Sequence, residues 1–347
     1  MTTVHIDHRG ADIDVDGDRL VVRVEGERKG TLPLNLIERL VVSGVARLTT
    51  RLVAKLAERG IGLVLDRVGR GLGATAVVAA RADRTLRLAQ YDALADMPAR
   101  LGLARPLVRE KIEGGVRLLA ALETSGTGER RALADAVRRM TESMSLAADP
   151  AATPDVHVLR GREGAAARAF FPAFATAFAP SLDFTGRNRR PPRDPVNVCL
   201  SLGYTLAHAE ALRIAARHGF DPTLGVYHDL APGRDSLACD LVEPVRPLVD
   251  AFAHRLFAES ILRPEDFSGR GEGGCQMGKT GRREFYRAFE DSCAPALRDA
   301  LDRTAQELAA RLAGRFKHRA AAALLTAHTN QDDRPEPEMS PAARDGP

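Results

Sequence analysis

The feature that most constrains the fold is a change of hydrophobic period near residue 85. Before it, apolar residues alternate along short runs separated by turn-forming residues. After it, they recur every three to four residues almost to residue 325. A period of two is typical of half-buried strands and a period of 3.6 of amphipathic helices. With 347 residues, two domains are expected. We therefore predict an α+β protein with a small β-sandwich-like domain, residues 1–82, and a larger all-α domain, residues 83–325.

The N-terminal strands are predicted from alternating apolar residues between glycine and aspartate turns. One helix, Thr49–Arg59, interrupts them, because apolar residues recur there at helical spacing and Gly60 follows as a stop. The strands are expected at Val4–Ile6, Asp12–Val15, Leu20–Val24, Thr31–Leu34, Ile37–Val42, Ile61–Leu65 and Gly73–Val78. This region contains no evident catalytic group, so chemistry is expected in the helical domain.

The second domain is predicted to consist of helices that carry apolar stripes at helical spacing. They are expected at 86–95, 107–122, Arg130–Ala147, Val156–Phe178, Pro195–His218, Cys239–Ile261 and Arg282–Arg319. Residues 326–347 are polar and proline-rich, and a disordered tail is expected there.

Composition narrows the class of protein. Hydrophobic residues make up 44% and charged residues 28%, and the net charge of +4 permits a polyanionic partner without requiring one. The four cysteines are far apart and form no C-x-x-C pair, which argues against a zinc knuckle and favours reduced thiols in the cytoplasm. The first residues do not resemble a signal peptide, and no apolar run is long enough to span a membrane.

The stretch Leu224–Glu243 interrupts the helical pattern and gathers two candidate metal ligands. His228 lies in a loop that contains the turn signal Pro232-Gly233, and Asp240 follows in the first turn of the next predicted helix. Each also has a structural explanation, as a hydrogen-bonded loop histidine and as an acid favoured by the helix dipole. An imidazole and a carboxylate held near one loop nevertheless indicate half of a metal site.

Glu163, in the sequence GREGAAAR, is the third predicted ligand. Its small neighbours would let a ligand approach, although local composition alone favours an exposed helical glutamate. Glu163, His228 and Asp240 would offer hard oxygen donors and one imidazole, which suits Mn²⁺ or Mg²⁺, while zinc stays an alternative. Open positions on such a metal would serve phosphoryl transfer.

Two basic groups are candidate DNA contacts, because guanidinium and ammonium groups suit phosphate oxygens. Solvated charged segments are the alternative for both. The first lies in GRNRRPPRDP and the second follows a glycine-rich loop; they comprise Arg187, Arg189, Arg190 and Arg193, and Lys279, Arg282 and Arg283. Residues Gly273–Thr280 match the letters of a nucleotide-binding P-loop but follow no predicted strand, so the match is interpreted as accidental.

Three polar or aromatic residues of the predicted apolar helix Pro195–His218 are minor candidates for the site. Tyr204, His208 and Glu210 are interpreted mainly as core residues, with His208 and Glu210 expected to be satisfied by an arginine or a backbone group.

Three segments together carry a resemblance to a known family. LRGREGAAAR, RNRRPPRDPVNVCLSLGYTLAHAEALR and GFDPTLGVYHDLAPGRDSLACDLVEPVRPLVD, in this order, resemble the integrase subunit of the CRISPR adaptation machinery. The N-terminal TLPLNLIERLVVSGVARLTTRLVAKLAERGIGLVLD resembles the β-domain of that family, and the likeness covers residues 3 to 320.

The resemblance implies a catalytic helical domain and metal ligands at Glu163, His228 and Asp240. The family often has a glutamate where this chain has Asp229, and some members have an acid where it has Leu237, which puts a second protein-bound metal in doubt. The resemblance also implies a homodimer formed through the β-domains and a small ferredoxin-like partner subunit.

The implied reaction is a metal-dependent transesterification. The 3′-hydroxyl of a short double-stranded foreign DNA attacks a phosphodiester of the CRISPR repeat, and the same site cleaves branched DNA as an endonuclease. Two other classes are kept as alternatives: a non-catalytic DNA-binding scaffold, and a zinc hydrolase that acts on a small molecule.

Overall fold

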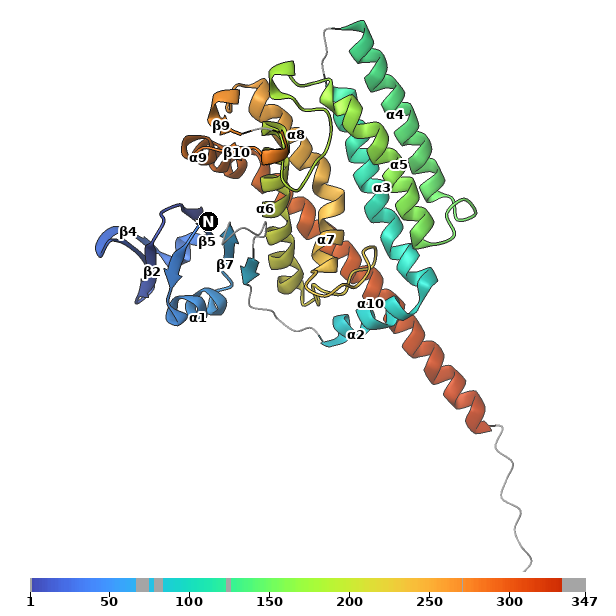
Figure 1. The fold of residues 1–347 in the computed structure, drawn as a ribbon. Helices are drawn as coiled ribbons and strands as arrows, with labels where there is room; N and C mark the ends of the chain where they lie inside the picture. The colour runs from blue at the N-terminus through green and yellow to red at the C-terminus, as the bar shows by residue number, and fades with distance from the viewer. Residues whose placement is uncertain (1, 67–74, 78–83, 123–125, 270, 333–347) are drawn as a thin grey trace, which may run out of the picture.

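A computed structural model describes residues 2–66, 75–77, 84–122, 126–269 and 271–332. A β-rich domain is followed by a helical domain, as the change of hydrophobic period predicts (Figure 1). The predicted strand Gly73–Val78 lies partly outside the described residues, which contain Thr75–Val77 as β8.

The β-domain contains two four-stranded sheets. In the first, β1 (Thr2–Ile6) pairs in parallel with β5 (Ile37–Ser43), β5 pairs in parallel with β7 (Gly62–Asp66), and β8 closes the edge in antiparallel. The second has the order β4-β3-β2-β6, with β2 at Ala11–Asp16, β3 at Arg19–Val24, β4 at Glu27–Pro33 and β6 at Ala46–Leu48. The short strand β6 was not predicted.

One hydrophobic core joins the two sheets and the helix α1 (Thr50–Glu58). It contains Ile6 and Leu40 of the first sheet, Ile13 of the second, and Leu52 and Leu56 of α1, all at most 5% exposed. Alternation along β2, where every other residue is buried, produces the inward face that period two predicts. The sandwich-like description is therefore confirmed.

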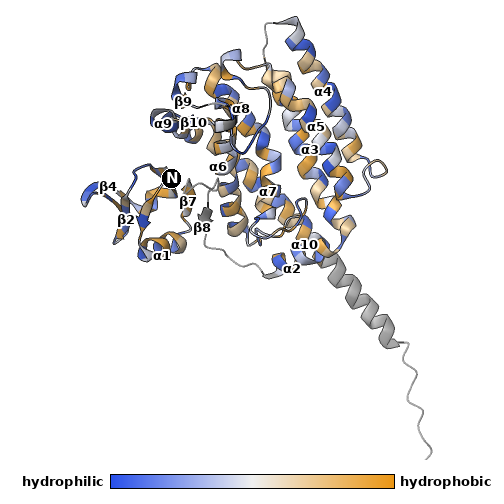
Figure 2. Cartoon of the chain, viewed as in Figure 1, coloured by the Kyte–Doolittle hydropathy of each residue, from blue (hydrophilic) through white to orange (hydrophobic). Residues whose placement is uncertain are grey.

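The helical domain is built from long helices around one core. They are α2 (Arg84–Ala95), α3 (Met97–Ala121), α4 (Thr127–Ala148), α5 (Val156–Ala175), α6 (Pro195–His218), α7 (Ser236–Val242), α8 (Arg246–Ala258), α9 (Lys279–Ala288) and α10 (Ala294–Asp332). Helix α6 is buried along most of its length and packs against α7, α8 and α10, while α3, α4 and α5 pack together on the side away from the β-domain (Figure 1). Figure 2 shows the hydrophobic residues of α6 and α8 at the centre of the domain.

Two predicted helices are each interrupted. The predicted helix Cys239–Ile261 is divided into α7 and α8 by the 3₁₀ turn Glu243–Val245, because Pro244 and Pro247 cannot donate helical hydrogen bonds. The predicted helix Arg282–Arg319 contains a π-helical turn, Phe289–Cys293, between α9 and α10. Helix α10 also continues to Asp332, past the predicted boundary at 325, and residues 333–347 lie outside the described residues.

A buried ion cluster joins the two domains. Arg39 of β5, only 2% exposed, lies 2.9 Å from Glu290 in the π turn and 3.4 Å from Glu210 of α6. Arg298 lies 2.9 Å from Glu290, and Arg213 lies 2.5 Å from Glu210. Glu210 is thus paired with arginines, as the sequence predicts: Arg213 donates to its Oε1, and Arg39 forms an ion pair with its Oε2. We call Arg39, Glu210, Arg213, Glu290 and Arg298 the junction cluster.

Among the described residues, no helix is long and apolar enough to cross a membrane.

Candidate metal centre

The loop that carries His228 is folded around the Asp240 carboxylate. Asp240 lies in α7 and is fully buried, and its Oδ2 accepts hydrogen bonds from the backbone N–H groups of Val226 (2.5 Å) and Tyr227 (2.9 Å). A Cβ on Gly225 would lie 2.7 Å from Ser236 Cβ and 2.9 Å from Asp240 Oδ2, so only glycine permits this approach of loop and helix. The loop is therefore held against the start of α7.

Two arginines fix the other side of the loop. Arg100 of α3 and Arg160 of α5 lie 2.7 and 2.6 Å from Asp229, and Arg100 Nε also donates to the Val226 carbonyl. Hydrogen bonds from Arg160 and then Arg100 lower the pKa of Asp229. Asp229, at the position where the family often has a glutamate, therefore acts as an anchor of the loop.

Asp240 also orients the His228 ring. Asp240 Oδ1 accepts from the His228 backbone N–H at 2.9 Å and lies 2.7 Å from His228 Nδ1. A neutral imidazole that donates its Nδ1–H to Asp240 keeps a lone pair on Nε2. His228 Nε2 lies 3.9 Å from Oε1 of Glu243, so this lone pair is on the side of a second carboxylate. The geometry makes Asp240 a positioning residue for the imidazole.

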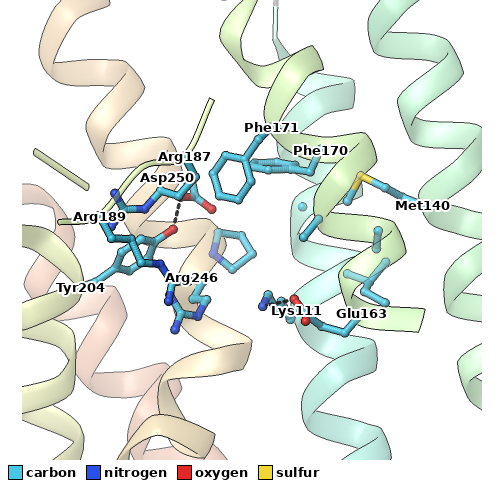
Figure 3. Close-up of a pocket in the computed structure, with 15 residues that line it drawn as sticks. Lys111, Met140, Glu163, Phe170, Phe171, Arg187, Arg189, Tyr204, Arg246 and Asp250 are labelled. Carbon is cyan, nitrogen blue, oxygen red and sulfur yellow. Dashed lines mark hydrogen bonds and ion pairs between the residues drawn. The ribbon is translucent and has the colours of Figure 1, made fainter. Parts of the chain in front are cut away.

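Glu163 and Glu243 converge on one ammonium group. Lys111 Nζ of α3 lies 2.5 Å from Glu163 Oε1 of α5 and 2.5 Å from Glu243 Oε2 in the turn after α7. A Cβ on Gly114 would lie 2.8 Å from Pro247, so glycine lets α3 approach the start of α8 closely enough for this contact. Segments of α3, α5 and the turn after α7, far apart in sequence, thus meet at Lys111. Figure 3 shows the side chains of Lys111 and Glu163 directed toward each other.

Glu243 is the more buried of these two acids. Its side chain is 4% exposed and also lies 3.0 Å from Arg246 Nε. Burial acts to raise the pKa of Glu243, but Arg246 and Lys111 outweigh it and hold this pKa at about 2. The carboxylate is therefore ionised at neutral pH, as a metal ligand must be.

The residues present fit a hard divalent cation. Two carboxylates already share one positive charge at 2.5 Å, and the imidazole nitrogen is directed by Asp240 to the same side. Within the described ranges, no three His, Cys, Asp or Glu side chains converge closely enough to form a metal-binding group as they stand, and Lys111 lies between the two carboxylates.

The sequence predicts Glu163, His228 and Asp240 as metal ligands, and the structure adds Glu243 as a further candidate. The structure leaves Asp240 fully engaged with the loop and places Glu243, one helical turn later, beside Lys111. The spacing of the two acids in DLVE was the available signal, since residues three apart share a helical face. Leu237, where some family members have an acid, is fully buried and offers no donor.

A cavity of about 90 Å³ lies beside Lys111 and Glu163. One wall is apolar, and the other carries Arg189, Arg246 and Tyr204 (Figure 3). Arg246 stacks on Tyr204, with Cζ 4.7 Å from the ring centroid, and the Tyr204 hydroxyl donates to Asp250. Burial raises the pKa of Asp250 to about 6. The apolar wall includes Ile112, Met140, Ala166, Phe170, Phe171 and Pro247. Tyr204, expected mainly in the core, thus lines a cavity next to the candidate ligands.

The two predicted basic segments lie against each other. The backbone N–H of Cys275 donates to the Pro192 carbonyl at 2.7 Å, and that of Gly271 donates to the Arg193 carbonyl at 3.1 Å. The glycine-rich loop is a hairpin in which β9 (Phe267–Ser268) pairs with β10 (Gln276–Met277). Its strands of two residues differ from the long strand that precedes a P-loop.

The predicted DNA contacts fall into two groups. The side chains of Arg189, Arg190, Arg193, Lys279 and Arg283 are exposed. By contrast, Arg187 is bound to Asn197 and Ser201, and Arg282 lies 3.1 Å from Asp7 of the β-domain and donates to the Met277 carbonyl. These two arginines organise the protein, and the five exposed side chains are available to a polyanion.

Comparisons with known proteins agree with this fold. The family model for CRISPR associated protein Cas1 matches residues 4–291. A CRISPR-associated endonuclease Cas1 of Thermodesulfovibrio yellowstonii is 37% identical over 84% of this chain and 91% of its own length. Another, from Rhodospirillum rubrum, is 34% identical over 84% of this chain and 86% of its own length.

Solved structures support the same architecture. A Cas1 protein from Thermotoga maritima superposes with a TM-score of 0.77 at 20% identity, over 90% of this chain and 97% of that one. A casposase bound to its integration product gives a TM-score of 0.71 at 21% identity, over 90% and 91%. The sequence matches over most of the chain and the shared fold together show that this protein belongs to the CRISPR-associated Cas1 family.

Proposed function

We propose that this chain is a divalent-metal-dependent DNA endonuclease and integrase of CRISPR adaptation. It would join the 3′-hydroxyl of a short foreign duplex to a phosphodiester of the CRISPR repeat, and would also cleave branched DNA. The relatives named as Cas1 endonucleases support an enzyme rather than a non-catalytic scaffold. The observation that carries the proposal is the convergence of Glu163 and Glu243 on one cationic point beside His228.

Glu163, Glu243 and the Nε2 atom of His228 would hold Mg²⁺ or Mn²⁺. A bound divalent ion supplies Lewis-acid polarisation of the phosphate and lowers the pKa of an attacking hydroxyl. Asp240 keeps the imidazole in the tautomer and orientation that ligation needs. Arg189 and Arg246 would orient the DNA phosphate from the cavity wall opposite the apolar side chains.

The exposed basic side chains of the two adjoining segments would hold the DNA backbone. Arg190, Arg193, Lys279 and Arg283 are suited to phosphate contacts that weaken as salt rises. A solved neighbour is a Cas1–DNA complex, which supports a nucleic-acid partner for this fold.

The assembly is part of the proposal. We infer a catalytic domain at residues 83–325 and a homodimer formed through the β-domain, residues 1–82. A solved neighbour belongs to a Cas6-RT-Cas1–Cas2 complex, which supports a partner subunit, and we infer that this partner is small and ferredoxin-like. Cytoplasmic location is inferred from the four cysteines, which form no disulfide and of which three are buried.

The test is an integration assay with a short duplex and a supercoiled plasmid that carries the CRISPR repeat, in Mn²⁺, in Mg²⁺ and in EDTA. Wild-type protein should join the duplex to the plasmid in a divalent metal and not in EDTA. Glu163→Gln, Glu243→Gln and His228→Ala should lose strand transfer while duplex binding persists.

Glu113→Gln is the matched control, because Glu113 lies on α3 near Lys111 but is exposed and paired with Arg117. This variant should keep wild-type activity. Full strand transfer by both Glu163→Gln and Glu243→Gln would contradict the proposed metal site.

A further inference from the structure

Lys111 occupies the point where the candidate metal ligands converge. Its ammonium contacts one oxygen of Glu163 and one of Glu243 at 2.5 Å each, and the lysine side chain is 21% exposed. Figure 3 shows Lys111 directed toward Glu163 at the edge of the cavity. We propose that Lys111 is an internal counter-cation that competes with the divalent metal for these two carboxylates, an inference that rests on the proposed metal site.

The need for such a cation follows from the charges of the two neighbouring glutamates. Two ionised carboxylates close together in a partly buried site repel each other unless a positive charge lies between them. Glu243 has a second cation, Arg246, at 3.0 Å, whereas Glu163 forms its ion pair with Lys111. Lys111 therefore keeps α3, α5 and the end of α7 together without a metal.

A divalent ion bound by the same oxygens would displace this ammonium. Like charges held by the same two carboxylates repel strongly, so both cations do not fit at the convergence point. A lysine can leave readily, because it is a single point charge on a flexible stem, unlike the planar guanidinium of arginine. The adjoining cavity, which Lys111 lines together with Arg189 and Arg246, offers the displaced ammonium a place.

After displacement by the metal, Lys111 would take a second position in which it can contribute to DNA binding. In the cavity it would join Arg189 and Arg246 on the side proposed to orient the DNA phosphate. Metal binding would then move one positive charge from the ligands toward the substrate. A purely structural salt bridge would instead support the ligand geometry, and its loss would weaken metal binding.

The test is direct measurement of Mn²⁺ binding to the full-length protein without DNA, by the EPR signal of free Mn²⁺. In Lys111→Met the competing charge is removed, so Mn²⁺ binding should tighten about tenfold. This factor corresponds to a binding free energy of about 1.4 kcal/mol. The same variant should melt at a lower temperature in EDTA and regain stability in Mn²⁺. Arg117→Met, on the same helix and 69% exposed, is the matched control and should bind Mn²⁺ as wild type does.

The variant Lys111→Arg keeps the proposal testable if Lys111→Met does not fold. A guanidinium held between the carboxylates should be harder to displace, so Mn²⁺ binding should weaken. Unchanged or weaker Mn²⁺ binding by a folded Lys111→Met protein, or unchanged binding by Lys111→Arg, would overturn the competition. Failure of the metal site itself has a different signature, since Glu163→Gln and Glu243→Gln would then bind Mn²⁺ as wild type does.

Discussion

The junction cluster and the candidate metal centre are built from the same kinds of side chain, yet their surroundings differ. At the junction, two glutamates meet three arginines, and Arg39 and Glu210 are at most 2% exposed. At the metal centre, two glutamates share a lysine, an imidazole stands nearby, and a cavity adjoins them. In the junction cluster, arginine side chains neutralise the glutamates and hold the two domains together. Beside the cavity, a single lysine neutralises the glutamates, and this cation can be exchanged for another.

The largest change in the free energy of unfolding is expected from a substitution in the junction cluster. Glu210→Gln removes the carboxylate charge that Arg213 and Arg39 share, while Arg39 keeps Glu290, so the free energy of unfolding should fall by about 3 kcal/mol. Urea denaturation measures this change, with Glu113→Gln as the surface control. A loss as small as that of the control would mean that the junction cluster does not stabilise the domain contact.

A substitution at the candidate metal centre should lower activity rather than stability. Glu163→Gln should lower the rate of strand transfer by at least about 100-fold, which is about 2.7 kcal/mol of barrier. Its side chain is 19% exposed, so its free energy of unfolding should change far less than that of Glu210→Gln. The comparison would break if Glu163→Gln lost stability as severely and kept its activity.

Asp240→Asn should have an intermediate effect, which is expected in metal affinity because Asp240 orients the His228 ring. Mn²⁺ affinity should fall by about 10- to 100-fold, as is typical when the residue that orients a metal-bound histidine is changed. An asparagine amide also places N–H donors where three backbone N–H groups now donate to Asp240. EPR titration measures the affinity. Complete loss of Mn²⁺ binding in this variant, with binding retained in Glu243→Gln, would return Asp240 to the ligand position.

The smallest effect concerns pH at the domain junction. His5 of β1 stacks on Tyr286 at 4.0 Å between ring centroids, and burial lowers the pKa of His5 to about 4. The unfolded chain binds this proton near pH 6.5 and the folded chain does not, so stability is retained above pH 6.5 and lost toward pH 4. Between pH 7 and pH 4.5, the loss of stability should be about 2 kcal/mol.

Urea denaturation at pH 7 and pH 4.5, for wild type and His5→Phe, tests this contribution. The carboxylates of Glu210 and Glu290 lie in the same region, so the difference between the two proteins is the relevant quantity. An equal pH dependence for both proteins would rule out His5 as the cause.

Local signals predicted the long elements well. Helix α6 matches its predicted bounds, because Asp194 caps its start, Pro195 occupies the first turn and Gly219 takes a positive φ at its end. The prolines at 244 and 247 were visible in the sequence, yet the apolar period continued past them and concealed the break between α7 and α8.

The metal centre was only partly predictable, because its geometry depends on distant contacts. The close approach of Gly225 to α7 places the Asp240 carboxylate against the loop, and Glu243 is the acid that meets Lys111. The hydrophobic periodicity of the sequence does not reveal this approach. Lys111 carries no motif and lies 52 residues before Glu163 and 132 before Glu243. Only the packing of α3 on Pro247 brings its ammonium to those acids.

The most direct measurement of the central claim is the anomalous diffraction of Mn²⁺ in crystals of the full-length protein. We expect a manganese peak in contact with carboxylate oxygens of Glu163 and Glu243 and with His228 Nε2, and a Lys111 ammonium moved toward the cavity. A peak coordinated by Asp240 in place of Glu243, or manganese bound elsewhere with Lys111 still between the two glutamates, would contradict it.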